Sequence, residues 1–141
     1  MPAASYPILE SERLAALRRY GILDTPAEPE FNDLVHLAAH ICEVPIALIS
    51  LVDGARQWFK AQVGLAVRET HRDMAFCAHA ILRPEEVLNV RDATLDSRFA
   101  DNPLVTGDPS IRFYAGVPLL TPERHALGTL CVIDRAPRDL T

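Results

Sequence analysis

Cysteine and histidine are the residues of this sequence best suited to nucleophilic or metal chemistry. Cys77 and His79 stand close together in the apolar stretch AFCAHAIL, residues 75–82. If that stretch is helical, their side chains lie about 200° apart around the helix axis, so they cannot share a ligand or a proton. We therefore exclude a simple Cys–His nucleophile or metal pair. His79 at the edge of an apolar helix indicates a hydrogen-bonded structural group or, alternatively, a residue that lines a small-ligand pocket.

The other cysteines and histidines form no stronger pattern. Cys42, Cys77 and Cys131 lie far apart among apolar neighbours without a CxxC motif, which predicts buried, reduced thiols. His36 and His40 have the i, i+4 spacing that places two imidazoles on one helix face, as in zinc sites. The motif HLAAH lacks the glutamate of the HExxH proteases. We interpret it as a solvated or subunit-facing surface, with a weak metal site as the alternative.

Composition and motifs exclude several function classes. The net charge of -5 and the scattered arginines argue against nucleic acid and anionic membrane surfaces as partners. The six glycines form neither a GxGxxG motif nor a P-loop, and no serine stands in a GxSxG motif. No run of about 18 apolar residues and no signal peptide is present. We therefore expect a cytoplasmic protein without nucleotide-hydrolysing or serine-hydrolase activity.

Helical periodicity places two helices at the start of the chain. The first is predicted over residues 11–20, with acidic residues in its first turn and Gly21 as its stop. The second is predicted over residues 31–44 and ends at Pro45. Its apolar arc would consist of Phe31, Leu34, Val35, Ala38, Ile41 and Cys42.

The remaining elements predict one α+β domain around an antiparallel sheet. Strand-forming residues indicate five strands, at residues 46–53, 56–64, 85–90, 112–120 and 126–134. The first is apolar on both faces, so we expect a central strand covered on each side. A polar loop over residues 68–74 leads to a short helix over 74–82, which Asp73 would cap. Helices should cover both faces of the sheet.

The long loop over residues 92–110 carries the strongest hint of a ligand site. A loop of this length in a compact domain is typical of a binding loop or lid. Taken singly, its polar residues are turn formers or caps. Taken together with Phe99 and the strand residues Arg112 and Tyr114, they could provide the polar contacts of a concave site: Asp92, Asp96, Arg98, Asp101, Asn102 and Thr106.

Five stretches, in order, closely resemble GAF domains, in particular those at the N-terminus of bacterial sensor histidine kinases and diguanylate cyclases. The resemblance runs from about Arg13 to Arg138 and rests on RLAALRRYGILDTPAEPEFNDLVHLAAHICEVPIALISLVDGARQWFKAQVGL, ETHRDMAFCAHAIL, VRDATLDSRFADNPLV, IRFYAGVPL and LGTLCVIDR. It implies a single GAF domain over residues 1–141 with a PAS-related, mainly antiparallel sheet of about five to six strands. The implied pocket would be roofed by residues 75–82 and 92–110 and floored by residues 113–117.

The resemblance also bears on cofactors. Cyclic-nucleotide-binding members carry an Asn-Lys-Phe-Asp-Glu pattern, whereas the only lysine here is Lys60 and Phe99 is followed by Asp101 and Asn102. Bilin-binding members attach the pigment through a Cys followed directly by His, and here Ala78 separates the two. We therefore expect neither a cyclic nucleotide of that type nor a covalent bilin, and the sequence requires no cofactor.

The resemblance implies a non-catalytic sensory domain that binds an unknown small molecule and signals to a downstream kinase or cyclase. It also implies a homodimer held by terminal helices, and a chain that stops before its trailing helix and output domain. The expected ligand-binding residues are Phe76, Cys77, His79, Asp92, Arg98, Phe99, Asn102, Arg112 and Tyr114. The alternatives are a ligand-free dimerisation scaffold whose aromatic side chains fill the pocket, and a thiol-dependent reductase of the free methionine sulfoxide type.

Overall fold

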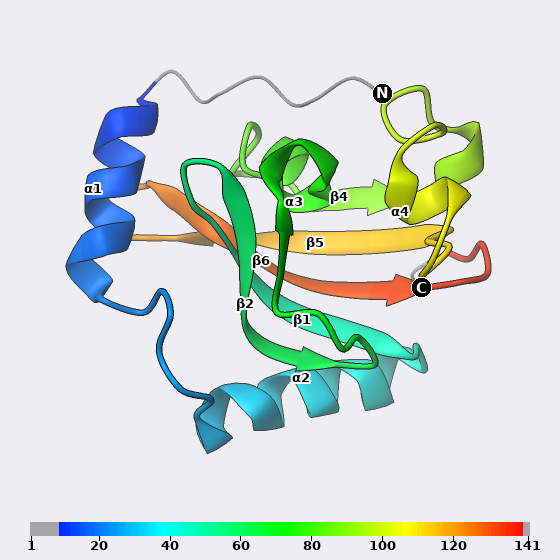
Figure 1. The fold of residues 1–141 in the computed structure, drawn as a ribbon, viewed down its shortest axis with the longest axis horizontal. Coiled ribbons are helices and arrows are strands. Elements are labelled where there is room, and N and C mark those ends of the chain that lie inside the picture. Colours follow the sequence, from blue (N-terminus) through cyan, green and yellow to red (C-terminus); the bar gives the residue numbers. More distant parts are fainter. Residues whose placement is uncertain (1–8, 140–141) are drawn as a thin grey trace.

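Strand-forming residues build a six-stranded antiparallel sheet in this chain, which a computed structural model describes from residue 9 to residue 139. The strands are β1 Ile46–Val52, β2 Arg56–Val63, β3 Glu69–His71, β4 Leu88–Val90, β5 Phe113–Leu120 and β6 Ala126–Asp134. The helices are α1 Glu10–Tyr20, α2 Pro29–Cys42, α3 Phe76–Ala80 and α4 Pro103–Thr106, with 3-10 turns η1 Arg72–Met74 and η2 Ala93–Leu95. Figure 1 shows their arrangement around the sheet.

Strand β1 lies at the centre of the sheet. The strand order is β3-β2-β1-β6-β5-β4, and every neighbouring pair is antiparallel. All seven residues of β1 are buried, which confirms the prediction of a central strand covered on both faces. Two hairpins, β1–β2 and β5–β6, are joined by the β1–β6 pairing, in which Ile46 lies opposite Ile133 and Leu51 opposite Gly128.

A bulge in β2 reverses which face of the sheet its side chains point to. Ile49 pairs with Ala61 but Ser50 pairs with Phe59, so Lys60 is an extra residue on the β2 side. Phe59 belongs to the core on one face, and Ala61 belongs to the core on the other. Residues two apart in a regular strand point to the same side, so the bulge is what separates these two side chains.

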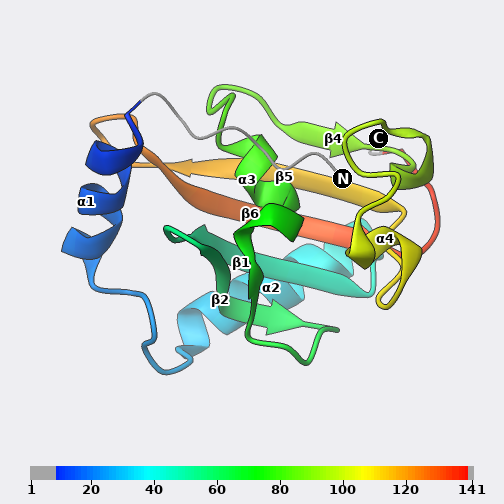
Figure 2. The same ribbon diagram turned by 45° about the horizontal axis from the view of Figure 1, so that its top comes forward.

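Helices cover both faces, as expected, and define two cores (Figures 1 and 2). Helix α2 packs on one face, where Val35 contacts a cluster that includes Ala47, Ile49 and Phe113. The opposite face lies beneath α3 and α4; we call residues 72–81 and 93–111 the roof. The core between sheet and roof is built from Ile46, Leu48, Phe59, Phe76, Val90, Ala93, Phe99, Val105, Ile111, Tyr114, Cys131 and Ile133.

Helix α1 stands across one end of the strands (Figure 2). Its Ala16 and Leu17 are fully buried against a cluster formed by Leu51, Trp58 and Leu127. The helix ends as predicted at Gly21, which has a left-handed backbone (φ 62°) and donates its N–H to the carbonyl of Arg18. None of the described helices combines the length and the apolar character that a membrane crossing requires.

Several local predictions need correction. The segment expected as a polar loop over residues 68–74 contains β3, which pairs with β2 at the edge of the sheet. The helix expected over residues 74–82 is only the five residues of α3, and Asp73 does not cap it. Ala75 occupies the N-cap position without a side-chain bond, and the N–H of Asp73 instead donates to Nδ1 of His71. Strand β4 begins at Leu88 because residues 81–86 form turns.

The apolar arc predicted for α2 is wider than the face that the sheet covers. Val35 is fully buried, but Leu34 is 47% exposed and Ile41 is 68% exposed. Leu37, which the predicted arc left out, is also more than half exposed. The helix therefore presents a second, uncovered apolar stripe beside its buried one.

Candidate functional site

A cavity of about 270 Å³ lies between the sheet and the roof. Its floor comes from β1, β2, β5 and β6 through the side chains of Ile46, Leu48, Phe59, Tyr114 and Ile133. Residues 64–67, which connect β2 to β3, form one wall, and the roof contributes Phe76, Leu104, Pro109 and Ile111. Most of this surface is apolar, so the cavity favours the carbon skeleton of a small organic molecule.

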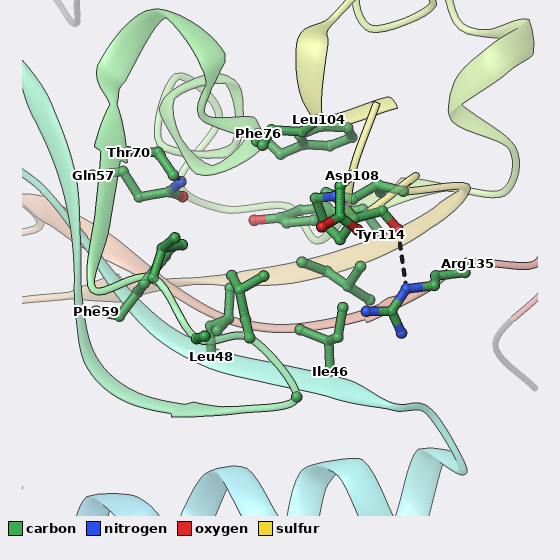
Figure 3. Close-up of a pocket in the computed structure, with 17 residues that line it drawn as sticks. Ile46, Leu48, Gln57, Phe59, Thr70, Phe76, Leu104, Asp108, Tyr114 and Arg135 are labelled. Carbon is green, nitrogen blue, oxygen red and sulfur yellow. Dashed lines mark hydrogen bonds between the residues drawn. The ribbon is translucent and has the colours of Figure 1, made fainter. Parts of the chain in front are cut away.

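Polar groups stand at two opposite ends of the cavity (Figure 3). Gln57 and Thr70, from β2 and β3, lie at one end, and Asp108 and Arg135 lie at the other. Gln57 is only 6% exposed, whereas Asp108 and Arg135 are exposed to solvent. Arg135 donates from Nε to the carbonyl of Pro109 at 3.0 Å, which fixes its side chain against the roof. The cavity therefore has a neutral inner end and a charged outer end.

Gln57 is the centre of a buried hydrogen-bond network at the inner end. Its Oε1 accepts from the hydroxyl of Ser50 at 2.8 Å and from the thiol of Cys77 at 2.7 Å. Its Nε2 donates to Oγ1 of Thr70 at 2.7 Å. Ser50 and Cys77 also contact each other, with 3.1 Å between Oγ and Sγ. The amide is thereby held with its oxygen toward β1 and α3 and its nitrogen toward Thr70.

The two buried thiols are poor nucleophiles. Burial raises the pKa of Cys77 to about 12, and the hydrogen bond with Ser50 and the charge of Arg72 offset this only in part. Burial likewise raises the pKa of Cys131 to about 12. Both groups are therefore protonated at neutral pH, and neither can supply a thiolate for covalent chemistry.

An aromatic cluster fills the part of the roof next to the cavity. Phe76 stacks on Phe99 with a centroid distance of 4.0 Å and 7° between the ring planes. Tyr114 contacts the same Phe76 ring at 5.1 Å, and its hydroxyl shares a hydrogen bond with Thr129 at 3.2 Å. The ring of His79 meets Phe99 edge-on at 4.8 Å. These contacts fix Phe76 as a rigid surface of the cavity.

The structure does not bring the expected binding residues into one site. Only Phe76 and Tyr114 line the cavity. Cys77 lies directly behind Gln57, and Phe99 lies behind Phe76. These four residues therefore act on the cavity by forming or supporting its walls.

The other expected residues lie outside the cavity. His79 and Arg98 line a separate surface pocket, and Asp92 lines another. Asn102 is buried, where it caps α4 through the N–H of Leu104 and donates from Nδ2 to the carbonyl of Met74 at 3.1 Å.

Arg112 and the charged loop residues make local contacts instead of facing the cavity. Arg112 donates to the carbonyls of Val105 and Ile111. Arg98 pairs with Asp96 at 2.8 Å, and that pairing lowers the pKa of the Asp96 carboxyl. None of these loop residues lines the cavity that Tyr114 lines, and a direct role of each in ligand binding stays a prediction.

Reasoning from sequence missed most of the cavity. Of the segments expected as roof and floor, residues 75–82 contribute Phe76, residues 92–110 contribute Leu104, Asp108 and Pro109, and residues 113–117 contribute Tyr114. The contributions of β1, β2, β6 and the wall at residues 64–67 were not foreseen. A usable signal was present in Gln57, a polar side chain two residues before Phe59 in a strand that had to lie beside the central one.

The arrangement of side chains around His36 and His40 does not support a metal site. Among residues 9–139 no three His, Cys, Asp or Glu side chains converge in a way that could hold a metal ion. His36 lies beside a shallow surface depression near Lys60. The notion of a weak metal site at His36 and His40 stays a prediction without a third ligand among these residues.

The sequence matches the family model of the GAF domain over residues 26–141. This chain belongs to the GAF domain family. The chain is also 50% identical over 138 residues to a cyclic di-GMP phosphodiesterase of Pseudomonas aeruginosa, and the match covers 98% of this chain but 23% of that protein. The expected family and the expected α+β sheet with helices on both sides are thus confirmed.

Solved structures show the same fold at low sequence identity. The GAF domain of a phosphoenolpyruvate-protein phosphotransferase from Acinetobacter is similar, with 23% identity, a TM-score of 0.62, and coverage of 92% of this chain and 81% of that chain. A free methionine-R-sulfoxide reductase from Neisseria meningitidis, solved in complex with its substrate, has 15% sequence identity and a TM-score of 0.63. The match covers 100% of this chain and 85% of that chain. At such identities the likeness concerns the fold alone.

Proposed function

We propose that this GAF domain binds a small molecule and regulates a larger bacterial signalling protein without itself catalysing a reaction. The cavity beneath the roof is the observation that carries this proposal. It has a volume of about 270 Å³, mainly apolar walls and polar groups at its two ends, a composition typical of sites for small organic molecules. Such sites usually measure about 300–1,000 Å³, so we expect a ligand much smaller than a dinucleotide.

Buried ion pairs between the roof and α1 support a regulatory role. Arg72, which begins η1 just before α3, lies 2.6 Å from the carboxylate of Glu10 in α1 and donates to the carbonyl of Asp53. Arg13 binds the same carboxylate at 2.8 Å. A ligand that favours one arrangement of the roof changes the free energy of this contact. We therefore propose that α1 receives the signal of cavity occupancy.

Similarity to a cyclic di-GMP phosphodiesterase supports an output in cyclic di-GMP signalling. This chain spans 23% of that protein, so the phosphodiesterase activity is stated of the relative alone. We propose that the present domain regulates an enzyme of this kind, a diguanylate cyclase or a histidine kinase. The homodimer and the cytoplasmic location expected from the sequence belong to the same proposal.

Two alternatives are less consistent with the geometry. A thiol reductase needs a reactive thiolate, whereas the pKa values of Cys77 and Cys131 are both raised to about 12 by burial. A scaffold with a filled pocket agrees with the stacking of Phe76 on Phe99. That stacking, however, leaves the adjacent cavity open.

Mass spectrometry of the purified chain under native and denaturing conditions tests the proposal. We expect an additional mass in the native spectrum that disappears on denaturation, because the cavity offers no group for covalent attachment. Leu104→Trp, which adds volume inside the cavity, should abolish the additional mass, whereas Leu95→Trp at an 84% exposed position should not. A bare native mass, combined with no stabilising compound in a broad small-molecule screen, would overturn the proposal in favour of a scaffold.

A further inference from the structure

Gln57 has an unused hydrogen-bond donor inside the cavity. A primary amide carries two N–H groups, and Nε2 of Gln57 donates one of them to Thr70. Among residues 9–139 the other N–H has no hydrogen-bond acceptor in the protein. Gln57 is only 6% exposed, so its contact with bulk water is small, and an acceptor atom of a bound ligand could satisfy the remaining N–H.

The network behind Gln57 fixes the direction of this donor. Two hydrogen donors, the Ser50 hydroxyl and the Cys77 thiol, converge on Oε1 from the side away from Thr70. The thiol can hold this position because burial keeps it protonated, with its pKa raised to about 12. Rotation of the amide by 180° would replace the two bonds accepted by Oε1 with donation from Nε2 to the Ser50 hydroxyl and to the thiol of Cys77, which is a weak acceptor. The N–H groups of Gln57 are therefore preorganised toward Thr70 and the cavity (Figure 3).

The inner end of the cavity carries no charge. Gln57 and Thr70 are neutral, and burial raises the pKa of the nearby Tyr114 hydroxyl well above its ordinary value, so it is neutral too. The charged side chains that line the cavity, Asp108 and Arg135, lie at the opposite end. A charged ligand group next to Gln57 would lose its hydration without gaining an ionic partner.

We propose that Gln57 and Thr70 select a small, mainly apolar ligand by binding an uncharged amide-like head group, with the ligand carbonyl accepting from Gln57. Thr70 supplies a hydroxyl that can donate to or accept from the same head group, as a carboxamide, lactam or nucleobase edge requires. The floor and roof then enclose the apolar part of the ligand through Leu48, Phe59 and Phe76. This inference rests on the proposed function, because it assumes that the cavity binds a ligand.

Four probes that share one ring and differ in the head group test the inference. Benzamide, benzoate, benzylamine and toluene are titrated at pH 7 into the isotopically labelled chain, and amide shifts of cavity residues such as Leu65 and Ile111 report binding. We expect benzamide to bind at least about tenfold more tightly than toluene, since the additional hydrogen bonds to a buried amide should be worth about 1.4 kcal/mol or more. Benzoate and benzylamine should bind more weakly than benzamide because the inner end is neutral.

Variants identify the residues responsible. Gln57→Leu should remove the preference for benzamide over toluene. If that variant does not fold because Ser50 and Cys77 lose their acceptor, Thr70→Val decides the question. It keeps the bonds of Ser50 and Cys77 to Gln57 but removes the Thr70 hydroxyl, which accepts from Gln57 and would contact the head group, so it should reduce the preference at least threefold. Thr94→Val, at an exposed position outside the cavity, should leave the preference unchanged.

The possible failures are distinguishable. Equal affinities for benzamide and toluene would overturn the role of Gln57 but leave the cavity as a binding site. A preference for benzamide that survives Thr70→Val and Gln57→Leu would also overturn it. If none of the four probes shifts any cavity residue at millimolar concentration, the inference fails, whereas the proposed function fails only with a bare native mass and a negative broad screen.

Discussion

Burial of Cys77 changes the chemistry of this residue from nucleophile to hydrogen-bond donor. With the pKa raised to about 12, roughly one thiol in 10⁵ is ionised at pH 7. We expect Cys77 and Cys131 to resist a water-soluble disulfide reagent in the native chain at pH 7.5, and Cys42, which is only partly buried, to react first. Timed labelling followed by peptide mass spectrometry checks this order, and unfolding in denaturant should make all three thiols reactive. Rapid labelling of native Cys77 would contradict the assignment and revive the reductase alternative.

Residue types around the long loop, together with the resemblance to GAF domains, predicted part of the cavity. Phe76 and Tyr114 were expected to line it, and both do. The separation of Cys77 from His79 around the helix was also predicted correctly, since Cys77 contacts Gln57 and His79 contacts Phe99. The polar residues of the long loop were assigned to the cavity because loops often carry binding groups. Such residues serve equally well as caps and local ion pairs, and only the three-dimensional path of the chain distinguishes the two uses.

Close packing of β1 against β6 depends on Gly128. A Cβ atom at this position would lie 1.8 Å from the carbonyl oxygen of Ser50 and 2.8 Å from Cα of Leu51, both of which are backbone atoms that cannot move aside. We expect Gly128→Ala to lower the free energy of unfolding by about 3 kcal/mol or more. Chemical denaturation measures the change. Gly54→Ala is the matched control, because nothing lies within 4 Å of its Cβ, and it should change stability by less than about 0.5 kcal/mol.

The connector between α1 and α2 is held by the one lysine of the chain. Lys60, 2% exposed, donates from Nζ to Thr25 Oγ1 at 2.7 Å and to the carbonyl of Pro26 at 2.8 Å, and pairs with Glu28 at 2.6 Å. Lys60→Met keeps the apolar stem but leaves these acceptors without their donor, so we expect a loss of about 2 kcal/mol. Amide hydrogen exchange should accelerate in the connector. Glu28→Gln removes only a half-exposed ion pair and should cost less than about 1 kcal/mol.

Long elements were predicted more reliably than short ones. Strands β1, β2, β5 and β6 are seven to nine residues long and contain strand-forming residues, and their patterns identify them. Strand β3 consists of Glu, Thr and His, three residues without an apolar alternation, so its pairing at the sheet edge leaves no trace in the local sequence. The bulge at Lys60 was not foreseen either, because it depends on the register with β1.

Acid should destabilise the whole molecule partly through Glu10. Burial raises the pKa of this carboxyl, but the hydrogen bonds and charges of Arg13 and Arg72 outweigh burial and hold the pKa below its ordinary value. A lowered pKa in the folded state stabilises the fold above the unfolded pKa of about 4.3, and this contribution is lost as the pH falls through the folded value. We expect Glu10→Gln to cost about 1–2 kcal/mol at pH 7.

The difference in stability between the native sequence and Glu10→Gln should then shrink as the pH falls below about 4.3, because the native carboxyl becomes protonated there. Thermal unfolding of both chains from pH 3 to pH 7 measures it. Glu12→Gln, an exposed acidic residue on the same helix, is the control and should show little difference at any pH. A difference in stability between the native chain and Glu10→Gln that stays constant with pH would contradict the role of the ion pairs.

The strand order sets the time at which the sheet can be completed during synthesis. Strand β1 lies between β2, its neighbour in sequence, and β6, the last strand within residues 9–139. Until β6 leaves the ribosome, β1 can pair on one side only and exposes an apolar edge to other chains. The domain therefore folds late in its own translation, through a contact of high sequence separation. A ribosome that stalls before residue 126 would release a chain with half a sheet, and such a chain would depend on chaperones to avoid aggregation.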